Sequence, residues 1–154
     1  GISKLGGLVP VWNDLKACRN LVIVACGTSY YAGCVGKYIF EKLTDVDVQV
    51  ELASEFRYRK LNFPARTFII AISQSGETAD TLAAIREAKR KGARLLGIVN
   101  VVGSSISRET EAGVYNHAGP EIGVASTGRG RRRISRKRGG ADRSWATAGF
   151  AKTA

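Results

Sequence analysis

The chain has 154 residues, with 24 lysines and arginines against 13 acidic residues, which gives a formal net charge of +11. This length favours one domain that can bury a hydrophobic core. No apolar stretch approaches the ~20 residues of a membrane span, and the first residues lack the basic-then-apolar pattern of an export signal. The three cysteines, Cys18, Cys26 and Cys34, and the single His117 lack zinc-ligand spacing. We therefore expect a cytoplasmic protein with reduced thiols, no metal site and no cofactor.

Apolar runs and helical patterns alternate along the chain. The first helix is expected within residues 1–19, where several apolar side chains share one face. Runs of β-branched residues predict strands near 20–26, 46–52, 66–73, 94–100 and 113–117, and helical spacing predicts helices near 29–43, 54–59, 77–91 and 104–110. Such alternation is typical of an α/β fold with a parallel sheet covered on both faces.

Two polar turns follow apolar strands in this pattern. Leu21–Ala25 leads into Cys26–Ser29, and Phe68–Ile72 leads into Ser73–Thr78. The carboxyl ends of parallel strands meet at one edge, and ligands bind where the strand order reverses. Backbone N–H groups and the positive ends of helices there can hold a phosphate. The sequence therefore predicts a phosphate-ester site with hydroxyls and one amide, formed by Thr28, Ser29, Ser73, Gln74, Ser75 and Thr78.

The second turn also permits a purely structural interpretation. Ser75 is the expected N-cap of a helix over 77–91, with Glu77 as an acid in its first turn. The expected buried face has Ala79, Leu82, Ile85 and Ala88, while Thr81 is expected on another face.

A phosphate at this turn would be held without positively charged side chains from the turn itself. No lysine or arginine occurs from Ile72 to Ile85, so neutral donors and a helix end would hold the phosphate.

Other phosphate motifs do not fit the spacing. In Gly33–Tyr38 only two residues separate the glycines, where a P-loop has four. No Gly-x-Gly-x-x-Gly follows an apolar run, so the usual dinucleotide fold is unsupported. The pattern thus argues against a nucleotide enzyme.

Cys26–Ser29, Ser73–Thr78 and Gly119–Thr127 resemble the sugar isomerase (SIS) domain family. Two further segments, Glu51–Arg59 and Asn100–Thr110, resemble the first SIS lobe of the glutamine–fructose-6-phosphate aminotransferases. The resemblance implies a three-layer αβα sandwich with a five-stranded parallel sheet, doubly wound in the flavodoxin-like manner. It covers residues 20–127, which we expect to form the SIS domain after a connector helix at 1–19.

The resemblance also implies a ligand and a pathway. Members of that family are isomerising transaminases of amino sugar biosynthesis, and they form homodimers. The resemblance implies that their first lobe binds fructose-6-phosphate or glucosamine-6-phosphate. Val124 and Ser126 match the loop that lines the sugar. The glutaminase domain and the second SIS lobe, which carries the catalytic groups, are missing from this sequence. We therefore expect a non-catalytic fragment, in which Glu77 is a helix-start acid and His117 a strand-end histidine.

Residues 128–154 differ from the rest of the chain. They hold nine basic residues and one acid, and so contribute +8 of the net +11. The resemblance stops at Gly128, and we expect a disordered basic tail produced by a frameshift. The alternative is a nucleic-acid-binding arm on a phosphosugar sensor, although the segment lacks aromatic interleaving and any helix-turn-helix pattern. A stand-alone sugar-phosphate isomerase is the other alternative function.

Overall fold

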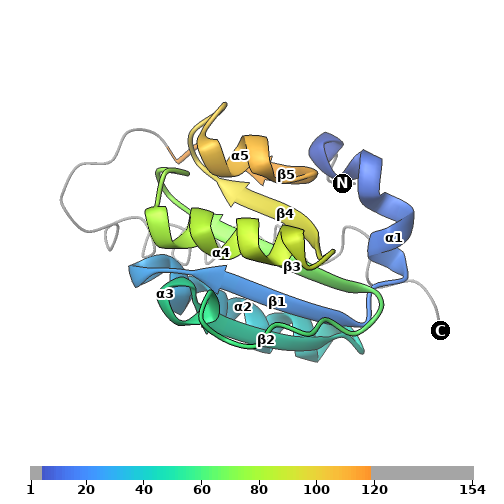
Figure 1. Ribbon diagram of the computed structural model, residues 1–154. Coiled ribbons are helices and arrows are strands. Elements are labelled where there is room, and N and C mark those ends of the chain that lie inside the picture. The colour runs from blue at the N-terminus through green and yellow to red at the C-terminus, as the bar shows by residue number, and fades with distance from the viewer. Residues whose placement is uncertain (1–4, 119–154) are drawn as a thin grey trace.

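A computed structural model describes residues 5–118 of the chain, and residues 1–4 and 119–154 lie outside this description. Strands and helices alternate along the described part, as the sequence predicts (Figure 1). The strands are β1 (Asn20–Ala25), β2 (Asp47–Leu52), β3 (Thr67–Ser73), β4 (Arg94–Val99) and β5 (Ala112–Tyr115). The helices are a 3₁₀ helix η1 (Gly6–Val11), α1 (Trp12–Lys16), α2 (Gly27–Leu43), α3 (Ala53–Phe56), α4 (Ala79–Arg90) and α5 (Ser105–Glu109).

The sheet has five parallel strands in the order β2-β1-β3-β4-β5, which confirms the expected fold class. From β1 the chain crosses to β2 at one edge of the sheet, and from β3 it continues to β4 toward the opposite edge. The strand order therefore reverses between β1 and β3, which is the switch point of a doubly wound sheet. In Figure 1, α4 lies in front of the sheet and α2 behind it.

Two hydrophobic cores separate the three layers. One joins the sheet to α3, α4 and α5 through residues such as Phe56, Ile69 and Ile85, and the other lies on the opposite face around Leu15, Ile23 and Phe68. Every residue of β3 is buried, because this central strand is covered on both faces. A cavity of about 380 Å³ opens on the second face between η1, α1, α2 and the sheet, with almost entirely apolar walls. No helix within residues 5–118 is long and apolar enough to cross a membrane.

The expected connector helix is not continuous. Residues 6–11 form the 3₁₀ helix, and the α-helix covers only Trp12–Lys16. Pro10 lies inside the 3₁₀ helix and has no N–H to donate to an α-helical hydrogen bond. Gly7 packs its backbone against β5, where a Cβ atom would overlap the backbone oxygen of Gly113.

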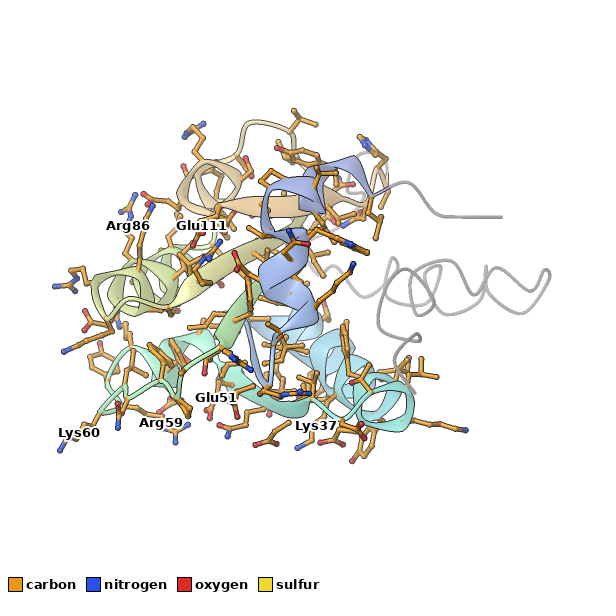
Figure 2. The ribbon with its side chains drawn as sticks, turned by 90° about the vertical axis from the view of Figure 1, so that its right-hand side faces the viewer. Lys37, Glu51, Arg59, Lys60, Arg86 and Glu111 are labelled. Atoms are coloured by element: carbon orange, nitrogen blue, oxygen red, sulfur yellow. The ribbon has the colours of Figure 1, made fainter. Side chains whose placement is uncertain are left out.

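A charged network attaches α1 to the sheet. Arg94 on β4 donates to Asp14 of α1, with an N···O distance of 2.8 Å, and to Glu111, with an N···O distance of 2.6 Å. Figure 2 looks onto the side where α1 crosses the sheet, and the labelled side chains of Glu51 and Arg59, which form an ion pair, lie next to each other below it.

Candidate phosphate-binding site

The two polar turns of the sequence lie at neighbouring strand ends. Ala25 pairs with Ile72 in the register of β1 and β3, so Cys26 and Ser73 leave the sheet side by side. The Thr81 hydroxyl on α4 lies 3.8 Å from the Cys26 sulfur, which joins the start of α4 to the first turn. The structure thus brings both turns together at the switch point.

Ser73 organises the second turn from inside. Its Oγ accepts a hydrogen bond from the Gly76 N–H at 3.0 Å and lies 3.0 Å from Thr78 Oγ1. Ser73 is only 3% exposed, and Gly76 has a φ of +71°, a conformation that favours glycine. Ser73 therefore shapes the turn, while the exposed Ser75 and the half-buried Thr78 stand closer to solvent.

The prediction that Ser75 caps the helix is wrong. Helix α4 begins at Ala79, its N-cap is Thr78, and Thr78 makes no side-chain cap bond. Ser75 Oγ instead accepts a hydrogen bond from the Glu77 N–H at 3.2 Å, which is a local turn of serine. The first N–H groups of α4 have no intrahelical acceptor, so they are available to an anion.

The buried face of α4 also differs from the prediction. Thr81, Ala84, Ile85 and Ala88 are buried, whereas Ala79 is exposed. Ile85 and Ala88 are thus buried as predicted, and Leu82 is half-buried. Thr81 faces the sheet, where its hydroxyl lies near the Cys26 sulfur.

The first turn has the same uncapped geometry. Helix α2 begins at Gly27, whose φ is +54°, and its N-cap Cys26 makes no side-chain cap bond. Thr28 and Ser29 are half-buried in the first helical turn. Two helices therefore direct uncapped N-termini and hydroxyls to the same edge of the sheet, which is how proteins bind phosphate with neutral groups.

Glu77 is not the first-turn acid that the sequence predicts. It precedes α4, and its Oε1 accepts a hydrogen bond from the Ser105 N–H at 2.7 Å. Hydrogen bonding to Ser105 holds the pKa of Glu77 below its usual range, and the nearby Arg108 acts in the same direction. The carboxylate therefore stays ionised and is a weak proton acceptor.

Sequence reasoning missed a cation beside this edge. Arg57, which follows α3, lies 3.7 Å from Asp80 in the first turn of α4. The spacing of charges in the sequence could not predict the ion pair between Arg57 and Asp80, because 23 positions separate these residues. Only the packing of α3 on α4 brings them together. The segment Glu51–Arg59, which carries part of the family resemblance, was the available signal.

The remaining candidates differ in position. The Gln74 side-chain oxygen is buried and has no hydrogen-bond partner within residues 5–118. His117 is exposed beyond the edge strand β5, two strands from Ser73, with a φ of +44°. Val124, Ser126 and the predicted tail at 128–154 lie outside the described residues.

The fold and its two turns define a doubly wound α/β domain in which two uncapped helix N-termini meet at the switch point. Residues 14–129 match the model of the SIS domain family, and the chain belongs to that family.

Among proteins of known activity, the chain is similar to glutamine–fructose-6-phosphate aminotransferases. It is 55% identical over 127 residues to the one from Chlorobaculum tepidum, which is 82% of this chain and 21% of that protein. It is 59% identical over 124 residues to the one from Clostridium tetani, which is 80% of this chain and 20% of that protein. This chain thus spans about a fifth of the length of these curated relatives.

A solved structure agrees with the sequence comparison. The C-terminal domain of glucosamine-fructose-6-phosphate aminotransferase from Francisella tularensis superposes with a TM-score of 0.73 and 44% identity. The match covers 76% of this chain and 33% of that one. The resemblance drawn from the turns is therefore confirmed.

Proposed function

We propose that this chain is the phosphosugar-binding lobe of a glutamine-dependent fructose-6-phosphate aminotransferase, with fructose-6-phosphate or glucosamine-6-phosphate as its ligand. The observation that carries the proposal is the meeting of two uncapped helices, α2 and α4, at the β1–β3 switch point. The identity to the aminotransferases supports the choice of ligand class.

The phosphate would sit between the two turns. The hydroxyls of Thr28, Ser29, Ser75 and Thr78 and the first N–H groups of α2 and α4 would donate to it, and Ser73 would hold the turn in shape. Gln74, whose side-chain oxygen lacks a partner among the described residues, would accept from a ligand hydroxyl. Arg57 would offset the negative charge of Asp80 in the first turn of α4 and so reduce its repulsion of the phosphate.

Binding a sugar phosphate and isomerising it require different groups in the protein. Isomerisation needs a positioned base to move a proton between adjacent carbons. The two turns offer hydroxyls and an amide, and the carboxylate of Glu77 is engaged with Ser105. We therefore propose that the chain by itself binds the sugar phosphate without converting it.

A titration followed by ¹H–¹⁵N NMR tests the proposal. We expect saturable shifts at both turns with fructose-6-phosphate, with a Kd in the ~0.1–10 mM range. Fructose without its phosphate is the matched control ligand and should produce no saturation. Absence of shifts at both turns with fructose-6-phosphate would overturn the proposed function.

A further inference from the structure

We propose that Glu77 is a positioning residue, which fastens the phosphate-binding turn to the start of α5 and thereby keeps the donors of that turn in place. This inference rests on the proposed function, because it assigns a role within the same site. It also removes Glu77 from the candidates for a catalytic base.

Several contacts join the turn to α5. Glu77 Oε1 accepts from the Ser105 N–H at 2.7 Å, and the Gly76 carbonyl accepts from the Ile106 N–H at 2.9 Å. Ser104, the N-cap of α5, makes no side-chain cap bond, so the neighbouring turn supplies the acceptors that a cap residue normally provides. Gly76 also packs directly on Ser104, which is 3% exposed. The turn and the start of α5 therefore form one hydrogen-bonded unit.

The carboxylate of Glu77 lies beside the proposed phosphate site, where a negative charge opposes the binding of an anion. Glu77 directly precedes Thr78, one of the proposed phosphate ligands. Its charge is directed to the Ser105 N–H, and Arg108 of α5 donates to Ser105 Oγ at 3.0 Å and to the Gly103 carbonyl. The carboxylate is thus partly neutralised by α5, so its attachment to α5 can outweigh its repulsion of the ligand.

The two effects of Glu77 predict opposite results for its removal. If repulsion of the phosphate dominates, Glu77→Ala binds fructose-6-phosphate more tightly than the unmodified chain. If attachment of the turn dominates, as we propose, Glu77→Ala binds about threefold or more weakly, since a bond to a charged group is lost. The sign of the change therefore decides the question.

Ser105→Pro removes the same hydrogen bond from the other side. Ser105 is the first residue of α5, where proline is well tolerated, and Ser104 already has the extended conformation that a following proline requires (φ −62°, ψ 161°). The variant lacks the N–H donor of the bond to Glu77, and it also lacks the Oγ that accepts from Arg108. We expect weaker binding than for the unmodified chain, and no further loss on adding Glu77→Ala, because both changes break the hydrogen bond between Glu77 and the Ser105 N–H. Ser105→Ala removes only the Oγ that accepts from Arg108 and should keep the affinity of the unmodified chain.

The experiment measures Kd for fructose-6-phosphate and for inorganic phosphate by NMR titration, with urea unfolding of each variant. Glu77→Gln keeps an oxygen acceptor and should restore much of the affinity lost in Glu77→Ala. Glu41→Ala, which removes an exposed carboxylate paired with Lys37 near the far end of α2, should bind like the unmodified chain. Unchanged unfolding midpoints together with weaker binding would separate positioning from general stability.

The possible outcomes are distinguishable. Equal or tighter binding by a folded Glu77→Ala variant overturns the positioning role alone. If Glu77→Ala does not fold, normal affinity of a folded Ser105→Pro variant overturns it. If the unmodified chain binds neither ligand, the proposed function fails, and the role of Glu77 in binding fails with it.

Discussion

Gly76 and Ser104 lie in direct contact where the turn after β3 meets the start of α5. A Cβ atom on Gly76 would overlap both Oγ and Cβ of Ser104, and the φ of Gly76 is +71°. No residue but glycine satisfies both conditions, because the position combines a left-handed backbone with a neighbour that is itself buried. This contact therefore holds the turn after β3 close to the start of α5.

We predict that Gly76→Ala destabilises the domain more than Gly103→Ala does. Gly103 has a similar φ of +73°, but nothing lies within 4 Å of the position of its missing Cβ. Gly103→Ala should therefore cost only the conformational strain, about 1–2 kcal/mol. Gly76→Ala adds a steric overlap and should also abolish binding of fructose-6-phosphate. Urea unfolding measures both variants, and equal losses of stability would show that Ser104 moves aside freely.

A second prediction separates the two serines of the turn. Ser73→Ala leaves the buried Gly76 N–H without its acceptor and should lower the free energy of unfolding by about 1–3 kcal/mol. Ser75 is exposed, so Ser75→Ala should change stability by less than about 0.5 kcal/mol. Each change should weaken binding of fructose-6-phosphate, and the double variant should abolish it. Unchanged affinity in a folded double variant would remove both serines from the site.

A third prediction concerns how the hydrogen bond between Glu77 and Ser105 responds to low pH. Because the pKa of Glu77 is lowered in the fold, its contribution to stability is present above the ordinary pKa of a glutamate and is lost as the pH falls through the lowered value. The amide signal of Ser105 should report this titration, with a midpoint below the usual ~4.3 of a glutamate. Glu77→Gln should remove this titration from the Ser105 signal. A midpoint at or above the usual value would contradict the hydrogen bond between them.

A fourth prediction is that the purified chain does not form glucose-6-phosphate from fructose-6-phosphate, since its two turns carry no free base. A coupled assay of glucose-6-phosphate measures this directly. Activity that disappears in Glu77→Gln or in His117→Ala would instead favour a stand-alone isomerase, with that residue as the base. Activity that persists in both variants would indicate a contaminating host isomerase.

Much of the fold follows from local sequence. The runs Leu21–Ala25 and Phe68–Ile72 predict buried parallel strands because β-branched residues without polar alternation suit a sheet covered on both faces. The turns after them are equally local, since small polar residues between a strand and a helix have few other roles. The position of the candidate site at the switch point follows from these two patterns together.

The partners of individual side chains depended on tertiary structure. Ser75 and Thr78 both have the chemistry of a helix cap. In the fold Gly76 has a left-handed conformation that interrupts a helix after Ser75, and α4 begins after Thr78. The sequence predicts that Glu77 is a first-turn acid of α4. In the fold its carboxylate instead accepts a hydrogen bond from the Ser105 N–H of α5, which is 28 positions away in the sequence. Sequence by itself determined the sheet and the positions of the two turns, because strand burial and turn chemistry act over a few residues. The tertiary structure alone decided which groups shape the turn and which remain free for a ligand, because a hydrogen bond depends on what the fold places within 3 Å.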